Sequence, residues 1–298
     1  MKIVPPITVT TAELDSTNVA ISETAWTAGT YNLGDQRYVG TRLYEVVADP
    51  STTDEPTAGA AADPPTWIDI GAINRFKMFD YVIGDATEQS AANIDVTVDL
   101  DAVVNSVALF EIVGSTVQIV VDDPTDGEVY DETYNLNDNT GVDNWYQYFF
   151  APIARKTELV VTDLPAYSTA TIQVVIANGG LDTAVGEVVF GRSVTLGITL
   201  MNFSLGIEDF SRKDRDQFGN FVITERRFAR IANYDVFVRN NQFVSSFNEL
   251  AKVRATPVVY IGDENKTETI VLGFYRSFST LRTGPNSSEM TLEVEGLV

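Results

Sequence analysis

The feature of the sequence that most constrains its fold is a series of short segments rich in β-branched residues and separated by clusters of turn-forming residues. Segments 94–100, 117–121, 158–162 and 170–177 are of this kind, and several alternate between apolar and polar residues. A turn cluster such as DDPTDGE at 122–128 marks where such a segment ends. Strand-like segments with turn signals about every dozen residues are typical of a β-sandwich.

The end of the chain continues this pattern and adds one helix. Segments 257–263, 268–278 and 290–298 resemble the strands of a β-meander. Before them, residues 245–254 carry apolar side chains at helical spacing, and Ser246 and Glu249 have the spacing of a capping box. We therefore predict a mainly β, multi-domain fold with one short helix near the end of the chain.

Two stretches suggest domain boundaries. Residues 49–66 are rich in Pro, Ala, Thr and Asp and poor in large apolar side chains, which predicts a long exposed loop or hinge. A second boundary is predicted near 201–220, where dense charge is mixed with turn residues. The resulting division is an N-terminal part at 1–72 with the first strand and a small β-module, a β-sandwich at 73–200, and a β-rich domain at 201–298.

Composition excludes several kinds of chemistry. The 298 residues include no Cys and no His, so the chain has no disulfide, thiolate metal site, Ser–His–Asp triad or imidazole ligand. The net charge of −22 disfavours binding to nucleic acid or to an anionic membrane surface. The opening segment MKIVPPITVT lacks the features of a signal peptide, and no apolar run is long enough for a membrane-spanning helix.

The negative charge is concentrated in the first two thirds of the chain. Residues 1–200 contain 29 acidic and 8 basic side chains, whereas residues 201–298 contain 13 and 12. Because like charge opposes close packing of copies, the neutral last third is the predicted docking surface. The alternative is that two domains simply differ in composition. The proposed interface residues form an arginine-rich stretch: Arg226, Arg227, Arg230 and Arg239.

The segment AWTAGTYNLGD at 25–35, followed by Gly40, Tyr44 and Trp67, resembles the small chitin-binding-type carbohydrate-binding modules. The family pattern is A-W-x-x-G-x-x-Y-x-x-G-D-x-V, then a Gly, a Tyr, a loop and a late Trp. Tyr31 stands one residue earlier than in that pattern.

In that family, exposed aromatic rings stack on the apolar faces of sugars. The resemblance therefore implies that Trp26, Tyr44 and Trp67 contact sugar. The alternative is that these rings form the core of a small β-module, which needs about this many aromatic side chains.

Four segments in the middle of the chain carry a second resemblance: INRFKMFD at 73–80, SVALF at 106–110, NWYQYFFAPI at 144–153 and LPAY at 164–167. They resemble the β-sandwich of many phage tail proteins, often described as carbohydrate-binding or galactose-binding-like. This resemblance implies a galactose-binding-like or jelly-roll sandwich at 73–200. The aromatic run 145–150 is predicted as a strand, with one face buried and the other exposed.

The last third resembles the closing domain of tail-tip or baseplate proteins of tailed phages, of the distal-tail type. The resemblance rests on residues 218–220 before a strand that carries Arg226 and Arg227, on FNELAKVRA at 247–255, and on LEVEGL at 292–297. It implies a virion structural protein, made in the host cytoplasm, that forms a homo-oligomeric ring. The ring would join the tail tube to hub and fibre proteins and bind host surface glycans weakly.

Other functions remain open alternatives. One is a carbohydrate-binding adhesin or receptor-binding protein, and another is a polysaccharide-degrading enzyme, which needs only two carboxylates at a set separation. Nothing marks one carboxylate pair among the 42 acidic residues, so we expect no enzyme and no cofactor. The acidic segment 122–128 offers oxygen ligands for calcium but lacks EF-hand spacing, which favours a solvated turn.

Overall fold

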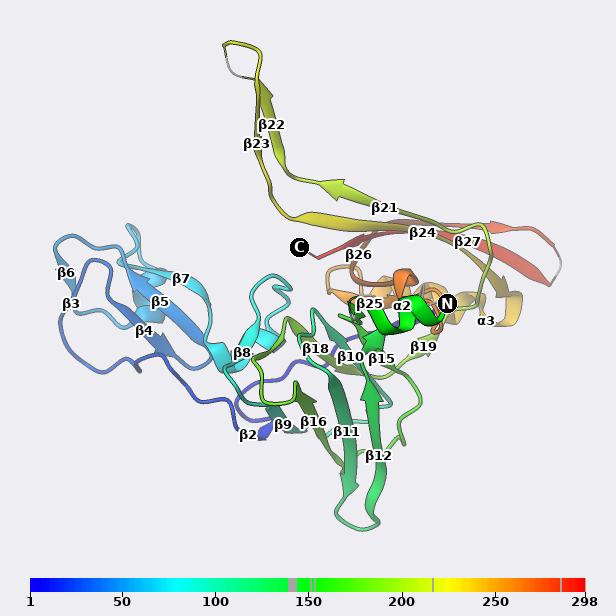
Figure 1. Ribbon diagram of the computed structural model, residues 1–298, viewed down its shortest axis with the longest axis horizontal. Coiled ribbons are helices and arrows are strands. Elements are labelled where there is room, and N and C mark those ends of the chain that lie inside the picture. The colour runs from blue at the N-terminus through cyan, green and yellow to red at the C-terminus, as the bar shows by residue number, and fades with distance from the viewer. Residues whose placement is uncertain (139–143, 151, 153, 216, 285, 298) are drawn as a thin grey trace.

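The computed structural model describes residues 1–138, 144–150, 152, 154–215, 217–284 and 286–297. Strands account for 48% of the structure and helices for 11%. The predicted mainly β, multi-domain character is therefore confirmed. The strands are distributed over several sheets, and a long hairpin and a separate lobe extend from the central part (Figure 1).

Two sheets form the sandwich in the middle of the chain. The five-stranded sheet has the order β12 (Gly127–Asn135), β11 (Thr116–Asp123), β16 (Thr171–Ala177), β9 (Ile94–Asp99) and β2 (Leu14–Thr17). The three-stranded sheet has the order β15 (Leu159–Val161), β10 (Ser106–Phe110) and β18 (Glu187–Gly191). Alternate side chains of both sheets meet in one apolar cluster, for example Val96, Ile119, Val174, Val107 and Phe190.

The three-stranded sheet is buried on both faces. All residues of β10 and β18 are buried, and their second set of side chains, such as Ala108 and Val189, packs against Val259 and Leu272 of the largest sheet. A strand buried on both faces has a continuous rather than an alternating apolar sequence, as SVALF and EVVFG do. The three-stranded sheet therefore joins the sandwich to the C-terminal part of the chain.

The largest sheet has eight strands and combines both ends of the chain. Its main path is β19 (Val194–Thr195), β1 (Lys2–Val4), β25 (Val258–Ile261), β26 (Ile270–Arg282), β27 (Ser287–Gly296), β24 (Phe228–Arg239) and β20 (Ile198–Thr199), and β21 (Ser204–Asp209) also pairs with β24. Helix α3 (Asn240–Lys252) places Leu250 in the apolar cluster on one face of this sheet, where it packs with Tyr234 and Val236.

The N-terminal lobe has its own small core. A three-stranded sheet contains β4 (Gln36–Val39), β5 (Arg42–Val46) and β7 (Trp67–Ala72), and beside it lie the pair β3 (Tyr31–Asn32) and β6 (Ser51–Thr52) and the helix α1 (Pro56–Ala60). The core consists of Tyr31, Tyr44, Val46 and Trp67. Figure 1 shows this lobe standing apart from the sandwich on one side of the molecule.

The remaining elements are short. Three antiparallel pairs are β8 (Thr87–Gln89) with β17 (Thr183–Val185), β13 (Asn137–Asp138) with β14 (Ala154–Arg155), and β22 (Arg212–Arg215) with β23 (Phe221–Thr224). The helical turns are η1 (Asn74–Phe79), α2 (Trp145–Phe150) and η2 (Thr267–Thr269).

Several predicted elements are present with shifted ends. The predicted strands at 94–100, 117–121, 158–162 and 170–177 correspond to β9, β11, β15 and β16. The predicted helix begins earlier than expected, at Asn240, because β24 ends at Arg239 and leads directly into it. Ser246 is not a cap: it is buried inside α3, and its hydroxyl donates a hydrogen bond to the Leu196 carbonyl at 2.9 Å.

Two further sequence predictions, besides the capping box at Ser246, are wrong. The aromatic run at 145–150 forms helix α2 instead of a strand, and the Asn144 side chain caps it by accepting a hydrogen bond from the Gln147 amide at 2.9 Å. The stretch 49–66 is not simply an open loop, because it contains β6 and α1. The Glu55 carboxylate caps α1 by accepting a hydrogen bond from the Ala58 amide at 3.0 Å.

Sheet membership crosses the predicted domain boundaries, which stay a prediction. Strand β1 lies before the N-terminal module in sequence but pairs with β25, near the end of the chain. Strand β2 pairs with β9 in the sandwich. The opening 17 residues thus add one strand to each of two later sheets.

Candidate assembly surface

A long β-hairpin projects from the eight-stranded sheet. We define residues 210–227 as the arm; it contains β22 and β23 and joins β21 to β24. Figure 1 shows the arm extending well beyond the rest of the chain. All eight residues of β22 and β23 are exposed, and among the described residues these strands pair only with each other. An isolated two-stranded hairpin is marginally stable in water, so this arm lacks the support that strands in larger sheets receive.

The arm and its base expose large apolar side chains. Phe221, Val222 and Ile223 are each more than half exposed, with relative exposures of 62%, 53% and 65%. Large apolar side chains are also exposed on β21 and at the start of β24: Leu205, Ile207 and Phe228. Several exposed apolar side chains on neighbouring paired strands favour an interaction site. The arm is therefore the strongest candidate surface for contact with another protein.

The arm is also the basic part of an acidic molecule. Residues 210–227 carry five basic and three acidic side chains, a net charge of +2, so the rest of the chain carries −24. Lys213 pairs with Asp209 at 2.6 Å, and the Arg215 guanidinium lies over the Phe221 ring at 4.4 Å. The hydrogen bond from Lys213 is the main reason that the pKa of Asp209 lies below its usual range.

The four arginines predicted as an interface do not form one cluster. Arg226 and Arg227 lie in the connection between β23 and β24, outside any strand. Arg239 is at the opposite end of β24 from Arg230, and nine residues of extended strand separate them by roughly 30 Å. Of these four arginines, Arg226 and Arg239 are exposed and have no described ion pair or side-chain hydrogen bond.

Arg227 and Arg230 instead contact the sandwich. The Arg227 guanidinium donates a hydrogen bond to the Gly84 carbonyl at 2.6 Å, and Arg230 pairs with the largely buried Glu158 at 2.5 Å. Burial raises the pKa of Glu158, while the charge of Arg230 opposes that rise. Both arginines line a cavity of about 450 Å³ between the sandwich and the eight-stranded sheet. Their shared role is to hold these two parts together at the base of the arm.

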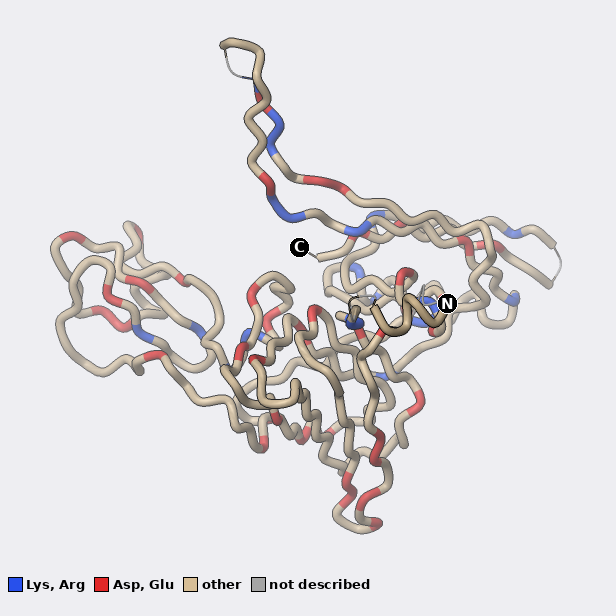
Figure 2. The backbone as a smooth tube through the Cα atoms, in the orientation of Figure 1, with Lys and Arg blue, Asp and Glu red and all other residues tan. Residues whose placement is uncertain are grey.

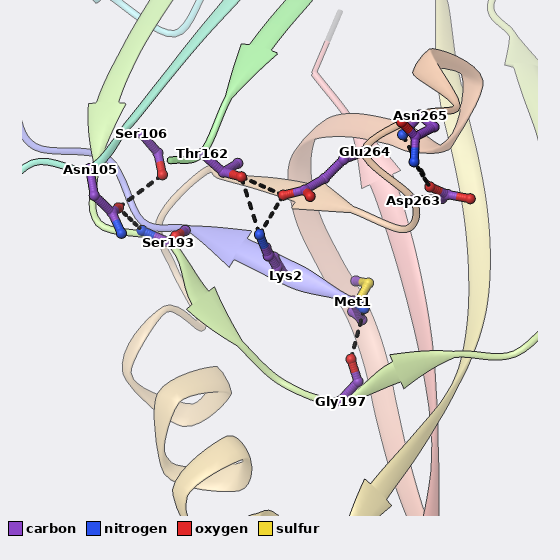
Figure 3. Close-up of polar contacts among 10 residues, drawn as sticks. All are labelled: Met1, Lys2, Asn105, Ser106, Thr162, Ser193, Gly197, Asp263, Glu264 and Asn265. Atoms are coloured by element: carbon purple, nitrogen blue, oxygen red, sulfur yellow. Dashed lines mark hydrogen bonds and ion pairs between the residues drawn. The ribbon is translucent and has the colours of Figure 1, made fainter. Parts of the chain in front are cut away.

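A second polar junction lies around the first strand (Figure 3). The Met1 amino group donates a hydrogen bond to the Gly197 carbonyl at 2.8 Å, and burial is the main cause of its lowered pKa. The Lys2 ammonium pairs with Glu264 at 2.5 Å and donates to the Thr162 hydroxyl at 3.2 Å. Strand β1 therefore links the sandwich, through Thr162, to the loop after β25.

Helix α2 is a second exposed apolar surface. Its aromatic residues are 68–78% exposed: Trp145, Tyr146, Tyr148, Phe149 and Phe150. The Trp145 and Phe149 rings lie nearly parallel, with centroids 6.3 Å apart and an interplanar angle of 23°. The strand prediction assigned half of these rings to a core and therefore missed this surface. A run of aromatic residues with one polar residue has no clear period that distinguishes strand from helix.

The rings predicted to contact sugar lie mainly in the core of the N-terminal lobe. Trp67 is completely buried, and its indole N–H donates to the Asp54 carbonyl at 3.1 Å. Tyr44 is 8% exposed, whereas Trp26 is partly exposed at the margin of the same core. Sugar contact stays a prediction for all three. The burial of Trp67 and Tyr44 favours a structural role, because stacking on a sugar requires an open ring face.

The acidic segment 122–128 forms the turn of the β11–β12 hairpin. One Asp123 carboxylate oxygen accepts hydrogen bonds from the Thr125 and Asp126 amides at 2.9 and 3.1 Å, and the other accepts from the Thr169 hydroxyl at 2.6 Å. The Thr169 hydrogen bond is the main cause of the lowered pKa of Asp123. Asp123 therefore fixes the turn. Within the described residues, no group of three or more Asp or Glu side chains is arranged to hold a metal ion.

Comparison with known protein families found no matching family model, and comparison with curated proteins found no match. Among the described helices, none combines the length and apolar character needed to cross a membrane. The functional argument therefore rests on the sequence resemblance and on the geometry of the chain itself.

Proposed function

We propose that this chain is a structural component of a bacteriophage tail tip or baseplate, which assembles with copies of itself into a ring between tail tube and hub or fibre proteins. The phage assignment comes from the sequence resemblance described above. The proposal gives the chain no catalytic step and no cofactor.

One observation carries the assembly part of this proposal. The arm exposes Phe221, Val222 and Ile223 on a hairpin whose two strands pair, among the described residues, only with each other. Burying such side chains yields about 25 cal/mol per Å² of apolar surface, so a protein partner that covers the arm gains binding free energy. An arm that projects from a rigid sheet is suited to joining subunits, whereas an enzyme requires reactive groups gathered in a cleft.

The direct test is the oligomeric state of the purified full-length chain. We expect sedimentation velocity to show a discrete oligomer, and negative-stain electron microscopy to show closed rings. Phage particles that lack the protein should have tails without a finished tip. A chain that stays monomeric at its highest soluble concentration, or infectious particles that lack it, would contradict the proposal.

A second candidate, a glycan-binding adhesin, is favoured by the exposed rings of α2. Trp145 and Phe149 present open aromatic faces, which the buried rings of the N-terminal lobe do not. For this function, Trp145→Ala should abolish retention on host polysaccharide, and the equally exposed control Leu281→Ala should not. Equal retention by both variants would remove the candidate.

A further inference from the structure

The β11–β12 hairpin is the most acidic projection of the molecule. Residues 78–154 contain 15 acidic side chains and no Lys or Arg. Six of the acidic residues lie in this hairpin: Asp122, Asp123, Asp126, Glu128, Asp131 and Glu132. Figure 2 shows them gathered along the hairpin and its tip. None of the six forms an ion pair with a described residue.

Two of these carboxylates face each other. Asp122 and Glu128 are directly opposite in the antiparallel pairing of β11 and β12, and both are exposed. Like charges at opposed positions of an antiparallel pair destabilise it. A cationic group placed over this pair would remove the repulsion. The pairing of Asp122 with Glu128 is therefore an arrangement that favours a basic partner.

The arm is an extended hairpin with a basic surface, which can bind the acidic β11–β12 hairpin. The arm exposes Arg215 and Arg226, and neither forms an ion pair with a described carboxylate. About nine residues per side give the arm a reach of roughly 25–30 Å. In Figure 2 the arm and the acidic hairpin point away from the centre of the molecule in opposite directions. The arm of one chain is thus far from the acidic hairpin of the same chain and open to that of another.

We propose that the arm of one chain docks on the acidic β11–β12 hairpin of a second copy. This inference rests on the proposed function and identifies the contact through which the copies associate. The two surfaces differ and lie at opposite ends, so the contact is head-to-tail, the type that closes into rings or extends into filaments. Charge complementarity sets the register, and the apolar side chains of the arm contribute buried area.

Charge-reversal variants of the full chain test the contact. The arm variant carries Arg215→Glu and Arg226→Glu, and the hairpin variant carries Asp122→Lys and Glu128→Lys. Each should weaken self-association at least about tenfold, because like charges then meet at the contact. The four changes together leave the net charge at −22 and restore opposite charges, so the combined variant should assemble again. A mixture of the two separate variants should do so too.

The matched control is Asp15→Lys with Glu268→Lys. It changes the net charge by the same amount as the hairpin variant, at two exposed positions outside both surfaces. We expect it to assemble like the unmodified chain in sedimentation velocity. Normal assembly of the arm or hairpin variant would overturn the inference, as would a combined variant that does not recover. A monomeric unmodified chain would instead overturn the proposed function.

Discussion

Glu187 is a buried carboxylate that no cation neutralises among the described residues. It lies in β18 and is 1% exposed; one of its oxygens accepts a hydrogen bond from the Tyr81 amide at 2.8 Å, and the other has no described partner. Burial raises its pKa to about 9, and the nearby Asp80 adds to that rise. The carboxyl group is therefore neutral in the folded chain at pH 7.

This raised pKa makes stability depend on pH. Between about pH 4.5 and 9, the unfolded chain ionises Glu187 while the folded chain keeps it protonated. The free energy of unfolding should therefore fall as pH rises through this window, by up to about 1.4 kcal/mol per pH unit. Glu187→Gln should remove this part of the slope in urea unfolding measured at several pH values. An unchanged slope would show that Glu187 ionises in the folded chain.

Gly59 tests how tightly the N-terminal lobe is packed. A Cβ atom at this position would lie 2.4 Å from both the Thr66 hydroxyl oxygen and Trp67 Cδ1. Gly59→Ala should destabilise the lobe by about 1–3 kcal/mol, despite the better helix propensity of alanine. Tryptophan fluorescence during thermal unfolding is the measurement. Gly29→Ala is the control, because its Cβ would meet no atom closer than 3.9 Å, and an equal loss there would contradict the packing argument.

At the scale of elements, strands that alternate were predictable and the aromatic helix was not. In β9 and β16 every second residue is apolar and buried, and in β11 this holds from Val117 to Val121, so the alternation in the sequence predicts these strands. Helix α2 depends on a cap at Asn144 and exposes its rings, and neither fact follows from hydrophobic periodicity. The arm is equally hidden from pattern analysis, because its exposed apolar residues resemble those of a half-buried strand.

The ion pair between Arg230 and Glu158 joins β24 to the sandwich. Arg230→Met should leave a buried carboxylate without a partner and lower the free energy of unfolding by about 2 kcal/mol. Adding Glu158→Gln should recover part of this loss, because the buried charge is then removed. Urea unfolding of the two single variants and the double variant forms the required cycle. Strictly additive effects would mean that the two side chains do not stabilise each other.

At the scale of the whole molecule, the acidic and basic residues lie in different parts of the fold. The charge contrast between residues 1–200 and 201–298 predicts that the neutral last third is the docking surface. Figure 2 shows a finer division, in which basic residues concentrate at the arm and acidic residues at the β11–β12 hairpin and the N-terminal lobe. Counting residues in the sequence gives the net charge of each segment. Only the fold shows that the basic arm and the acidic β11–β12 hairpin project in opposite directions.

Removal of the arm separates assembly from folding. Residues 211–226 can be replaced by an Asn-Gly turn, since the Phe210 amide already donates a hydrogen bond to the Arg227 carbonyl at 3.2 Å. The melting temperature should change by no more than about 2 °C, because the arm is absent from the apolar cores. Sedimentation velocity should show only monomer. An oligomer of unchanged size would assign assembly to another surface.

The pairing of β1 with β25 also has a consequence for the order of events during synthesis. Residues 2–4 leave the ribosome before the other strands of this sheet, yet their partners at 259–261 follow more than 250 residues later. The pairing of β1 with β25 in the eight-stranded sheet therefore waits until residues 259–261 have been made, and such distant pairing is slow to form. The arm is attached to this sheet through β24. A nascent chain whose sheet is incomplete therefore cannot hold the arm in position to bind another copy. The topology thus delays contact between copies until strands β25 to β27 of each copy have been made.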